Sequence, residues 1–265
     1  MNRIDQKFIE LKKNKKKAFI AFVTAGDPDL QITKQLVIEL ERKGVDIIEL
    51  GVPFSDPLAD GPIIQKASMR ALSKGVTLKK ILDLVKALRR SVKIPLVLMT
   101  YYNPVLQYGL KKFAVDAAGC GVDGIIVPDL PPEEADEFIL PLSTKGLALI
   151  FLLAPTSTLA RMKMVSAKSK GFIYYVSLTG ITGPRESLPP QIHRDVCRIK
   201  KYTKLPVCVG FGVSRPDQAK AVVRSADGVI VGSAIIRELE KHSKSKDKIK
   251  KTAGFVAHLV KAVKK

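Results

Sequence analysis

The sequence has little of the thiol chemistry on which many small proteins and metal sites depend. Its 265 residues include three cysteines and no tryptophan. Cys120, Cys197 and Cys208 are odd in number and far apart. This spacing excludes a disulfide framework and a zinc site built on paired cysteines, and it fits a reducing cytoplasmic location. We interpret each cysteine as a small apolar packing residue.

Histidine is equally scarce. His193, His242 and His258 do not follow predicted strands, and none pairs with a Cys or Asp at ligand spacing. We interpret them as surface or helix-face residues, which removes most Ser–His, Cys–His and zinc mechanisms. No lysine closes a predicted strand, so a Schiff-base aldolase is disfavoured. The sequence therefore predicts no metal site and leaves acid–base chemistry by carboxylates.

Long apolar runs are absent too. No stretch reaches the roughly 18 apolar residues of a membrane-spanning helix, so no membrane association is predicted. The short apolar run 18–23 follows a lysine cluster, as in a signal peptide, but it continues into Thr24 without a cleavage site. We interpret it as a first strand.

Positive charge, in contrast, is abundant: the formal net charge is +20. Much of it lies in two segments, 12–17 and 241–265. These segments lack interleaved aromatic residues and any known nucleic-acid-binding motif, and Lys dominates Arg in them. A solvated lysine-rich face is the interpretation we favour, and nucleic-acid binding is not predicted.

Apolar runs recur along the chain with amphipathic, helix-like segments between them, which indicates a parallel sheet. Eight strand–helix units in a chain of about 250 residues match a (β/α)8 TIM barrel with a parallel eight-stranded core. A doubly wound sheet is the alternative. No linker divides the chain, so we expect one domain over residues 1–265. The predicted strands are 18–23, 47–50, 96–99, 124–127, 148–153, 172–176, 207–209 and 229–231.

The most informative residue is Glu49, which lies in the apolar run Ile47–Leu50. A carboxylate in a buried strand is costly unless it is paired or neutral. A second carboxylate, Asp60, follows in a loop without apolar periodicity, where we expect it to be solvated and ionised. One acid on a strand end and one on a loop suit proton transfer at two points of one substrate. The alternative is a structural Glu held by an internal cation.

Two glycine-containing loops follow the last two strands. Gly210 and Gly212 follow the seventh, and Gly232 and Ser233 follow the eighth and open a helix. Glycine lets the backbone approach a ligand, and free N–H groups at a helix start attract anions. This pair of loops predicts a phosphate site, although the glycines could also serve only tight turns.

Aromatic residues flank several strand ends, among them Phe22, Tyr101, Tyr174 and Phe211. They could be core residues or the walls of a flat apolar slot. With a phosphate site at one end and two carboxylates between, the slot interpretation predicts a phosphorylated substrate that carries a planar group.

These residues lie in segments that resemble the alpha chain family of tryptophan synthase over almost the whole sequence. The second segment, with both carboxylates in one frame, is very specific. The matching segments are 22–28, 48–62, 101–104, 127–132, 174–183 and 209–212.

The resemblance implies a (β/α)8 barrel that cleaves indole-3-glycerol phosphate to indole and glyceraldehyde 3-phosphate without a cofactor of its own. Glu49 would protonate the indole ring, Asp60 would accept a hydrogen bond from the indole nitrogen, and Tyr174 would orient Glu49. Phe22, Tyr101 and Phe211 would line the indole slot, and Thr182 would hold a closed loop against Asp60. The phosphate would be held by Gly183, Gly212, Gly232 and Ser233.

The resemblance also implies a beta chain that binds pyridoxal phosphate, in an alpha2-beta2 heterotetramer that consumes the indole. The loop that carries Asp60 is unusually apolar for a solvent-facing loop, which is typical of an interface. A chain that only activates the beta chain, without catalysis, is the competing hypothesis. The expected interface residues are Pro53, Asp56, Pro57, Leu58, Asn103 and Pro104.

Overall fold

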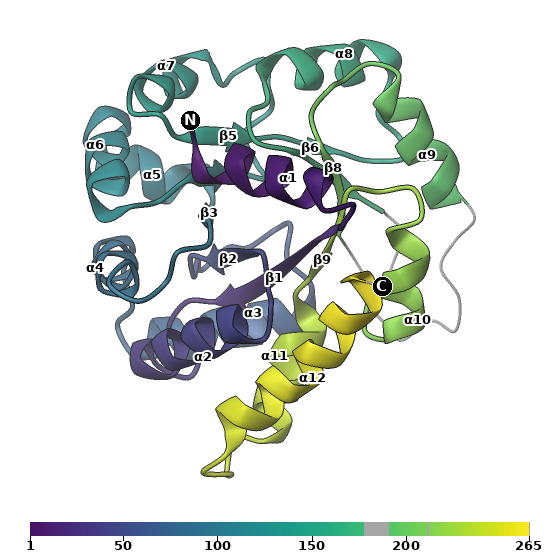
Figure 1. Cartoon of the computed structure of the whole chain (residues 1–265). Helices are drawn as coiled ribbons and strands as arrows, with labels where there is room; N and C mark the ends of the chain where they lie inside the picture. The colour runs from purple at the N-terminus through teal and green to yellow at the C-terminus, as the bar shows by residue number, and fades with distance from the viewer. Residues whose placement is uncertain (178–190, 211, 265) are drawn as a thin grey trace.

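A computed structural model describes residues 1–177, 191–210 and 212–264. Its strands and helices alternate along most of the chain (Figure 1). The strands are β1 (Ala18–Thr24), β2 (Ile47–Gly51), β3 (Leu96–Met99), β4 (Gly124–Ile126), β5 (Ala148–Ile150), β6 (Leu152–Leu153), β7 (Ile173–Val176), β8 (Val207–Gly210) and β9 (Gly228–Val231).

Helices follow or precede these strands as the amphipathic segments predict. They are α1 (Arg3–Lys13), α2 (Leu30–Arg42), α3 (Pro62–Ser73), α4 (Leu78–Leu88), α5 (Tyr102–Tyr108), α6 (Leu110–Cys120), α7 (Asp136–Thr144), α8 (Leu159–Lys168), α9 (Gln191–Lys200), α10 (Pro216–Val222), α11 (Ser233–Lys241) and α12 (Lys248–Lys264). Within the described residues, no helix combines the length and apolar character needed to span a bilayer.

The sheet closes into a barrel. All its pairings are parallel, in the order β5-β4-β3-β2-β1-β9-β8-β7-β6. The two outermost strands, β5 and β6, are consecutive in sequence and separated only by Phe151, whose carbonyl accepts a hydrogen bond from the Tyr174 amide. They are therefore the two halves of the predicted strand 148–153, which pairs with β4 through one half and with β7 through the other. The eight-stranded barrel is confirmed, and the doubly wound alternative is wrong.

Two apolar cores hold the barrel together. The larger one fills the layer between the outer faces of the strands and the helices. The smaller one fills the barrel interior, where side chains such as Ile20, Ile47 and Phe172 point inward. Helix α1, which the sequence analysis did not predict, inserts Ile4 and Phe8 into this inner core. It crosses in front of the ring of strands in Figure 1 and closes that end.

The barrel thus has two unlike ends. At the end that we call the amino end, the strands begin and α1 covers the interior. At the carboxyl end the strands finish, and the loops that follow them lead into helix N-termini. In barrels of this kind the carboxyl end carries the chemistry. Residues from β2, β3, β7, β8 and β9 that the sequence analysis selected all lie there.

Candidate active site

Glu49 is the central residue of the carboxyl end. It is paired in register with Phe22 of β1 and Val97 of β3, and its side chain faces the barrel interior with 0% of its surface exposed. Neither of its carboxyl oxygens has a hydrogen-bond partner among the described residues. Burial and, to a smaller extent, the nearby charge of Asp60 together raise the pKa of Glu49 from 4.5 to about 8. At neutral pH this carboxyl group is therefore mostly protonated.

Asp60 is held at the mouth of the barrel by Tyr101. The hydroxyl group of Tyr101 donates a hydrogen bond to the Asp60 carboxylate. The same hydroxyl oxygen accepts a hydrogen bond of 2.9 Å from the amide of Ala59. The Tyr101 ring stacks on Phe54, with 5.1 Å between centroids. Burial raises the pKa of Asp60 to about 6, and the Tyr101 bond opposes that rise. The expectation of a fully solvated Asp60 is wrong, because Tyr101 and its loop partly cover it.

The two carboxyl groups therefore differ in protonation near neutral pH. Glu49, with a pKa of about 8, stays protonated, while Asp60, with a pKa of about 6, is mostly ionised. Because the charge of Asp60 raises the pKa of Glu49, the two groups interact and these values belong to the pair. One proton donor and one hydrogen-bond-accepting carboxylate stand at the same opening.

Tyr174 and Phe22 complete the walls near Glu49. Tyr174 faces inward from β7 and is 6% exposed, and burial together with the charges of Glu49 and Asp60 raises the pKa of its hydroxyl group. Its ring leaves no room for a side chain at Gly210. The Phe22 ring similarly lies against Gly51 and Gly232, where an added Cβ would meet it at 2.5 and 3.1 Å. Glycine at these positions therefore makes space for the aromatic walls.

The predicted phosphate residues lie beside this wall. Gly232 is the N-cap of α11 and Ser233 is its first residue. The first amide groups of a helix have no partner within the helix and point outward, as an anion requires. Gly212 has a φ of +73°, a backbone conformation that favours glycine. Thr182, Gly183 and Phe211 lie outside the described residues.

Sequence reasoning missed Arg70, which ties together three elements around the site. From α3, its guanidinium donates to both carboxylate oxygens of Asp27 at 2.7 and 2.8 Å and to Glu240 of α11 at 2.9 Å. Asp27 follows β1 and is buried. Arg70 thereby fixes the helix that follows Asp60 against the helix that begins at Ser233. Arg70 stands ten positions after Asp60 in the sequence, and this spacing alone does not predict its contacts with Asp27 and Glu240.

The expected interface residues are distributed around the mouth of the barrel. Leu58 is 95% exposed, and Asp56 and Asn103 are also exposed. Pro57 and Pro104 are half-buried, and Pro53 is buried. The apolar surface offered to solvent by this loop is therefore concentrated at Leu58, and Pro53 supports the loop from below.

The described residues contain no group of three or more His, Cys, Asp or Glu side chains placed to hold a metal ion. His193 and His258 are exposed and His242 is half-buried, in or next to α9, α12 and α11. The histidine interpretation is therefore confirmed. What the site brings together is a protonated carboxyl group, an ionised one, an aromatic wall and a helix N-terminus.

Comparison with known proteins identifies the arrangement. A family profile described as "Tryptophan synthase alpha chain" matches residues 8–264. The tryptophan synthase alpha chain of Geotalea daltonii is 55% identical over 92% of each chain, and that of Geotalea uraniireducens is 52% identical over 100% of this chain and 98% of its own. The crystal structure of tryptophan synthase subunit alpha from Legionella pneumophila str. Paris superposes with a TM-score of 0.93 at 39% identity, covering 99% of this chain and 98% of that one.

Proposed function

The chain belongs to the tryptophan synthase alpha chain family, and from that premise we propose how its carboxyl end performs the family's reaction. The chain is a lyase of tryptophan biosynthesis that cleaves indole-3-glycerol phosphate to indole and glyceraldehyde 3-phosphate. The proposal concerns the residues that do this, their roles and the partner that receives the indole.

In our proposal Glu49 transfers the protons. Its neutral carboxyl group protonates the ring carbon that bears the side chain, and the resulting carboxylate then accepts the proton of the adjacent glycerol hydroxyl group. As that hydroxyl becomes an aldehyde, the carbon–carbon bond breaks and its electron pair returns to the indole ring. Glu49 ends the cycle protonated, as it began. Its raised pKa supports this role, because an acid must hold its proton at neutral pH to donate it.

The remaining residues would stabilise and position the substrate. Ionised Asp60 would accept a hydrogen bond from the indole nitrogen, where positive charge develops after ring protonation. Tyr174 would orient Glu49, and Phe22 and Tyr101 would flank the ring. Gly212, Gly232 and Ser233 would hold the phosphate through backbone N–H groups, together with Gly183. As the resemblance implies, Phe211 would line the indole slot and Thr182 would hold a closed loop against Asp60.

The observation that carries this proposal is the buried carboxyl group of Glu49, which lies near Asp60 and has no hydrogen-bond partner among the described residues. Glu49→Gln keeps the shape and removes the acid, so we expect indole release by the lone chain to fall by roughly 10²–10⁴-fold. Glu134→Gln, an exposed acid at the same end of the barrel, is the matched control and should leave the rate unchanged. Equal rates for Glu49→Gln and wild type would instead favour the non-catalytic activator.

We further propose that the alpha reaction uses no metal or cofactor, because Glu49 makes all the proton transfers that it requires. A single domain over residues 1–265 is also proposed, and it is consistent with one closed sheet that includes every described strand. The cytoplasmic location is proposed from the family's role in amino-acid biosynthesis.

A beta chain that binds pyridoxal phosphate is the proposed partner, in an alpha2-beta2 heterotetramer. Indole is small and apolar, so direct transfer would prevent its loss to solvent. Docking on Asp56, Pro57 and Leu58 and on the start of α5, which carries Asn103 and Pro104, would press on the Asp60 loop and lower the cost of ordering it. Pro53 lies beneath this surface. The Asp60 loop and Tyr101, which precedes α5, are already joined by the Ala59–Tyr101 hydrogen bond.

This coupling predicts that the beta chain accelerates indole release by at least about tenfold, a coupling free energy in the usual range. Asp56→Ala or Pro57→Ala should remove most of that acceleration and leave the rate of the lone chain nearly unchanged. The measurement is indole release with and without the cognate beta chain. Acceleration that survives both substitutions would move the interface elsewhere.

A further inference from the structure

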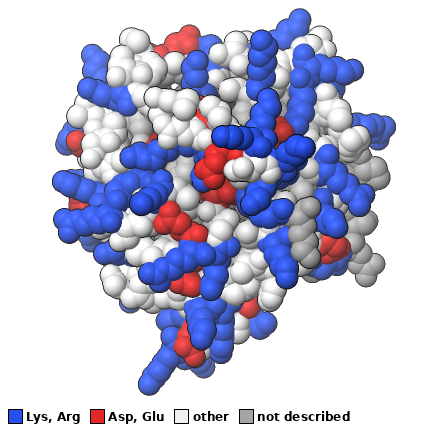
Figure 2. Space-filling view, in the orientation of Figure 1, with Lys and Arg blue, Asp and Glu red and all other residues white. Residues whose placement is uncertain are grey.

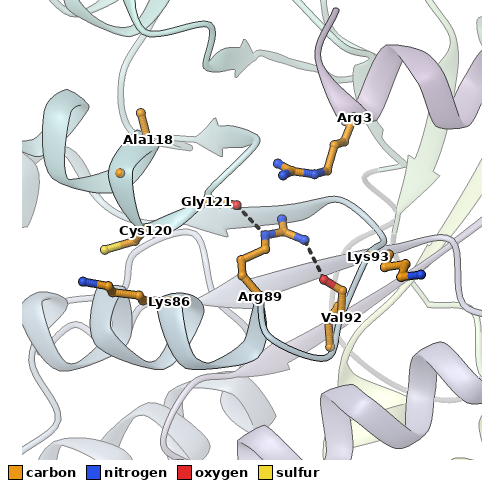
Figure 3. Close-up of a pocket in the computed structure, with 9 residues that line it drawn as sticks. Arg3, Lys86, Arg89, Val92, Lys93, Ala118, Cys120 and Gly121 are labelled. Atoms are coloured by element: carbon orange, nitrogen blue, oxygen red, sulfur yellow. Dashed lines mark hydrogen bonds between the residues drawn. The ribbon is translucent and has the colours of Figure 1, made fainter.

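The amino end of the barrel carries a hollow that the lyase reaction does not use. It has a volume of about 460 Å³ and lies between the ends of α4 and α6 and the start of α1 (Figure 3). Four of its lining residues are cations, namely Arg3, Lys86, Arg89 and Lys93, and none is an acid. A second hollow of about 510 Å³ shares Arg3, Ala118 and Gly121 with it, and its lining adds Lys145 and one acid, Asp123.

Cations at helix C-termini often serve only to balance backbone carbonyl groups. Of the four cations in this hollow, only Arg89 is seen to contact carbonyl groups within the described residues. Arg89 donates to the carbonyl oxygens of Gly121 at 2.7 Å and Ile94 at 2.7 Å, more weakly to that of Val92 at 3.3 Å, and to the Asp123 carboxylate. The exposed carbonyls and the buried acid of this region are therefore already satisfied.

The other cations make no such contacts with carbonyl groups. Lys86 and Lys93 of the first hollow and Lys145 of the second are exposed and form no ion pair among the described residues. Arg3 uses one nitrogen, at 2.8 Å from Asp123, and its side chain is 48% exposed. In Figure 3 the guanidinium groups of Arg3 and Arg89 lie close to one another across the hollow, with Lys93 and Lys86 on either side.

The surroundings reinforce this local excess. The described loops that precede strands contain twelve Lys or Arg residues against three acids, Asp46, Asp123 and Asp227. Eight helices lead into these strands, and their C-termini, at about half a charge each, would balance only about four of those cations. Lys and Arg side chains accordingly cover much of this face in Figure 2. Among the described residues, Asp123 and Glu41 offset part of this charge near the hollow, and the remaining excess is positive.

We propose that this hollow is a binding site for a compact oligophosphate, such as the di- or triphosphate group of a nucleotide. Several phosphate charges within one small group match a cluster of Lys and Arg side chains better than a single carboxylate would. Asp123 holds the guanidinium groups of Arg3 and Arg89 in place before the ligand arrives. The amines of Lys86 and Lys93 point away from this pair in Figure 3, and in our proposal these flexible side chains turn toward the phosphates on binding. Because it lies at the opposite end of the barrel from Glu49, this proposal does not rest on the proposed catalytic roles.

Isothermal titration with inorganic triphosphate tests the site, using the whole chain at physiological salt. Saturating glycerol 3-phosphate is included so that the site at Ser233 is occupied. We expect one triphosphate per chain, and binding weaker by about tenfold or more in the double variant Lys86→Gln/Lys93→Gln, since unit charges a few ångströms apart attract appreciably even in water. The matched control is Lys66→Gln/Lys163→Gln, which removes the same charge from exposed, unpaired positions elsewhere. It should bind as wild type.

Four outcomes would overturn the proposal: no binding of triphosphate, equal weakening in both double variants, equal affinity for triphosphate and monophosphate, or binding of single-stranded RNA without binding of triphosphate. The second would assign the effect to net charge, and the last to an extended surface rather than this hollow. If triphosphate binds as expected, a parallel titration with ATP distinguishes a nucleotide from a free oligophosphate by any gain in affinity from the base and ribose.

Discussion

Glu49 at the carboxyl end of this barrel differs from the buried carboxyl groups at the amino end. At the amino end, Asp123 accepts hydrogen bonds from Arg3, Arg89 and the amide of Leu96, and Asp46 bonds to Lys264 at 2.5 Å and to the amide of Phe19 at 2.7 Å. At the carboxyl end, Glu49 is more deeply buried and has no partner among the described residues. A paired acid contributes to the fold, whereas an unpaired one costs stability and retains a proton that chemistry can use.

The loops repeat the contrast. The described loops that follow strands contain seven acids and one cation, Arg215, while those that precede strands are strongly basic. Helix macrodipoles favour this arrangement, because helix N-termini face the carboxyl end and C-termini the amino end. Substitutions at the two ends should therefore separate activity from stability.

After Glu49→Gln, the largest effect on indole release is expected for Asp60→Asn at the carboxyl end. The amide can still accept a hydrogen bond but cannot stabilise positive charge on the indole nitrogen, so indole release should fall by about 10²-fold or more. Unfolding should be little changed. Asp56→Asn, an exposed residue of the same loop, is the control for the lone chain. A silent Asp60→Asn would remove the loop acid from the mechanism.

Arg89→Met at the amino end should produce the reverse pattern. It leaves Asp123 and the Gly121 carbonyl without their buried partner, so the free energy of unfolding should fall by about 3 kcal/mol or more. The turnover number per folded molecule should not change. Arg90→Met, an exposed neighbour, should alter stability by less than about 0.5 kcal/mol. Chemical denaturation and indole release measure the two quantities on the same samples.

Glu49→Gln should reveal the cost of the unpaired acid as a pH dependence. The folded pKa of about 8 exceeds the ordinary value of 4.5, so the unfolded chain loses this proton first as pH rises. The stability that protonated Glu49 contributes is therefore complete below pH 4.5 and is lost progressively up to about pH 8. By linkage, the variant should gain on wild type by at most about 5 kcal/mol between these limits. If the difference in unfolding free energy between Glu49→Gln and wild type did not change with pH, the raised pKa of Glu49 would be contradicted.

Ser233→Pro should have the smallest effect, confined to the phosphate. It removes one backbone N–H at a helix start, where proline itself is tolerated, so the Michaelis constant should rise by about tenfold with less change in turnover. Ser233→Ala retains that N–H and serves as the control. Calorimetry with glycerol 3-phosphate gives the affinity directly. If affinity were unchanged in Ser233→Pro, the phosphate would have to bind elsewhere.

Much of this arrangement could be predicted from the sequence, because parallel strands buried on both faces leave continuous apolar runs. All eight strands are present at or near their predicted positions, and the resemblance placed Glu49, Asp60 and Tyr174 at one end. Helix α1 was missed because its mean composition is polar and only Ile4, Phe8 and Leu11 are buried.

Contacts between distant side chains could not be predicted at all. The bond between Tyr101 and Asp60 and the tie of Arg70 to Asp27 and Glu240 join residues from separate elements, for which sequence spacing carries no signal. The split of one strand into β5 and β6 was equally hidden, because it depends on how the barrel closes and not on local composition.

The pH dependence of kcat/KM for indole release tests the central claim most directly. If protonated Glu49 and ionised Asp60 are both required, the profile is a bell with apparent pKa values of about 6 and about 8 that belong to the pair. Asp60→Asn should lose the acidic limb of that profile and retain the basic limb, which distinguishes Asp60 from the phosphate of the substrate. A profile that stays flat through pH 8 and above, or an acidic limb unchanged in Asp60→Asn, would contradict the account.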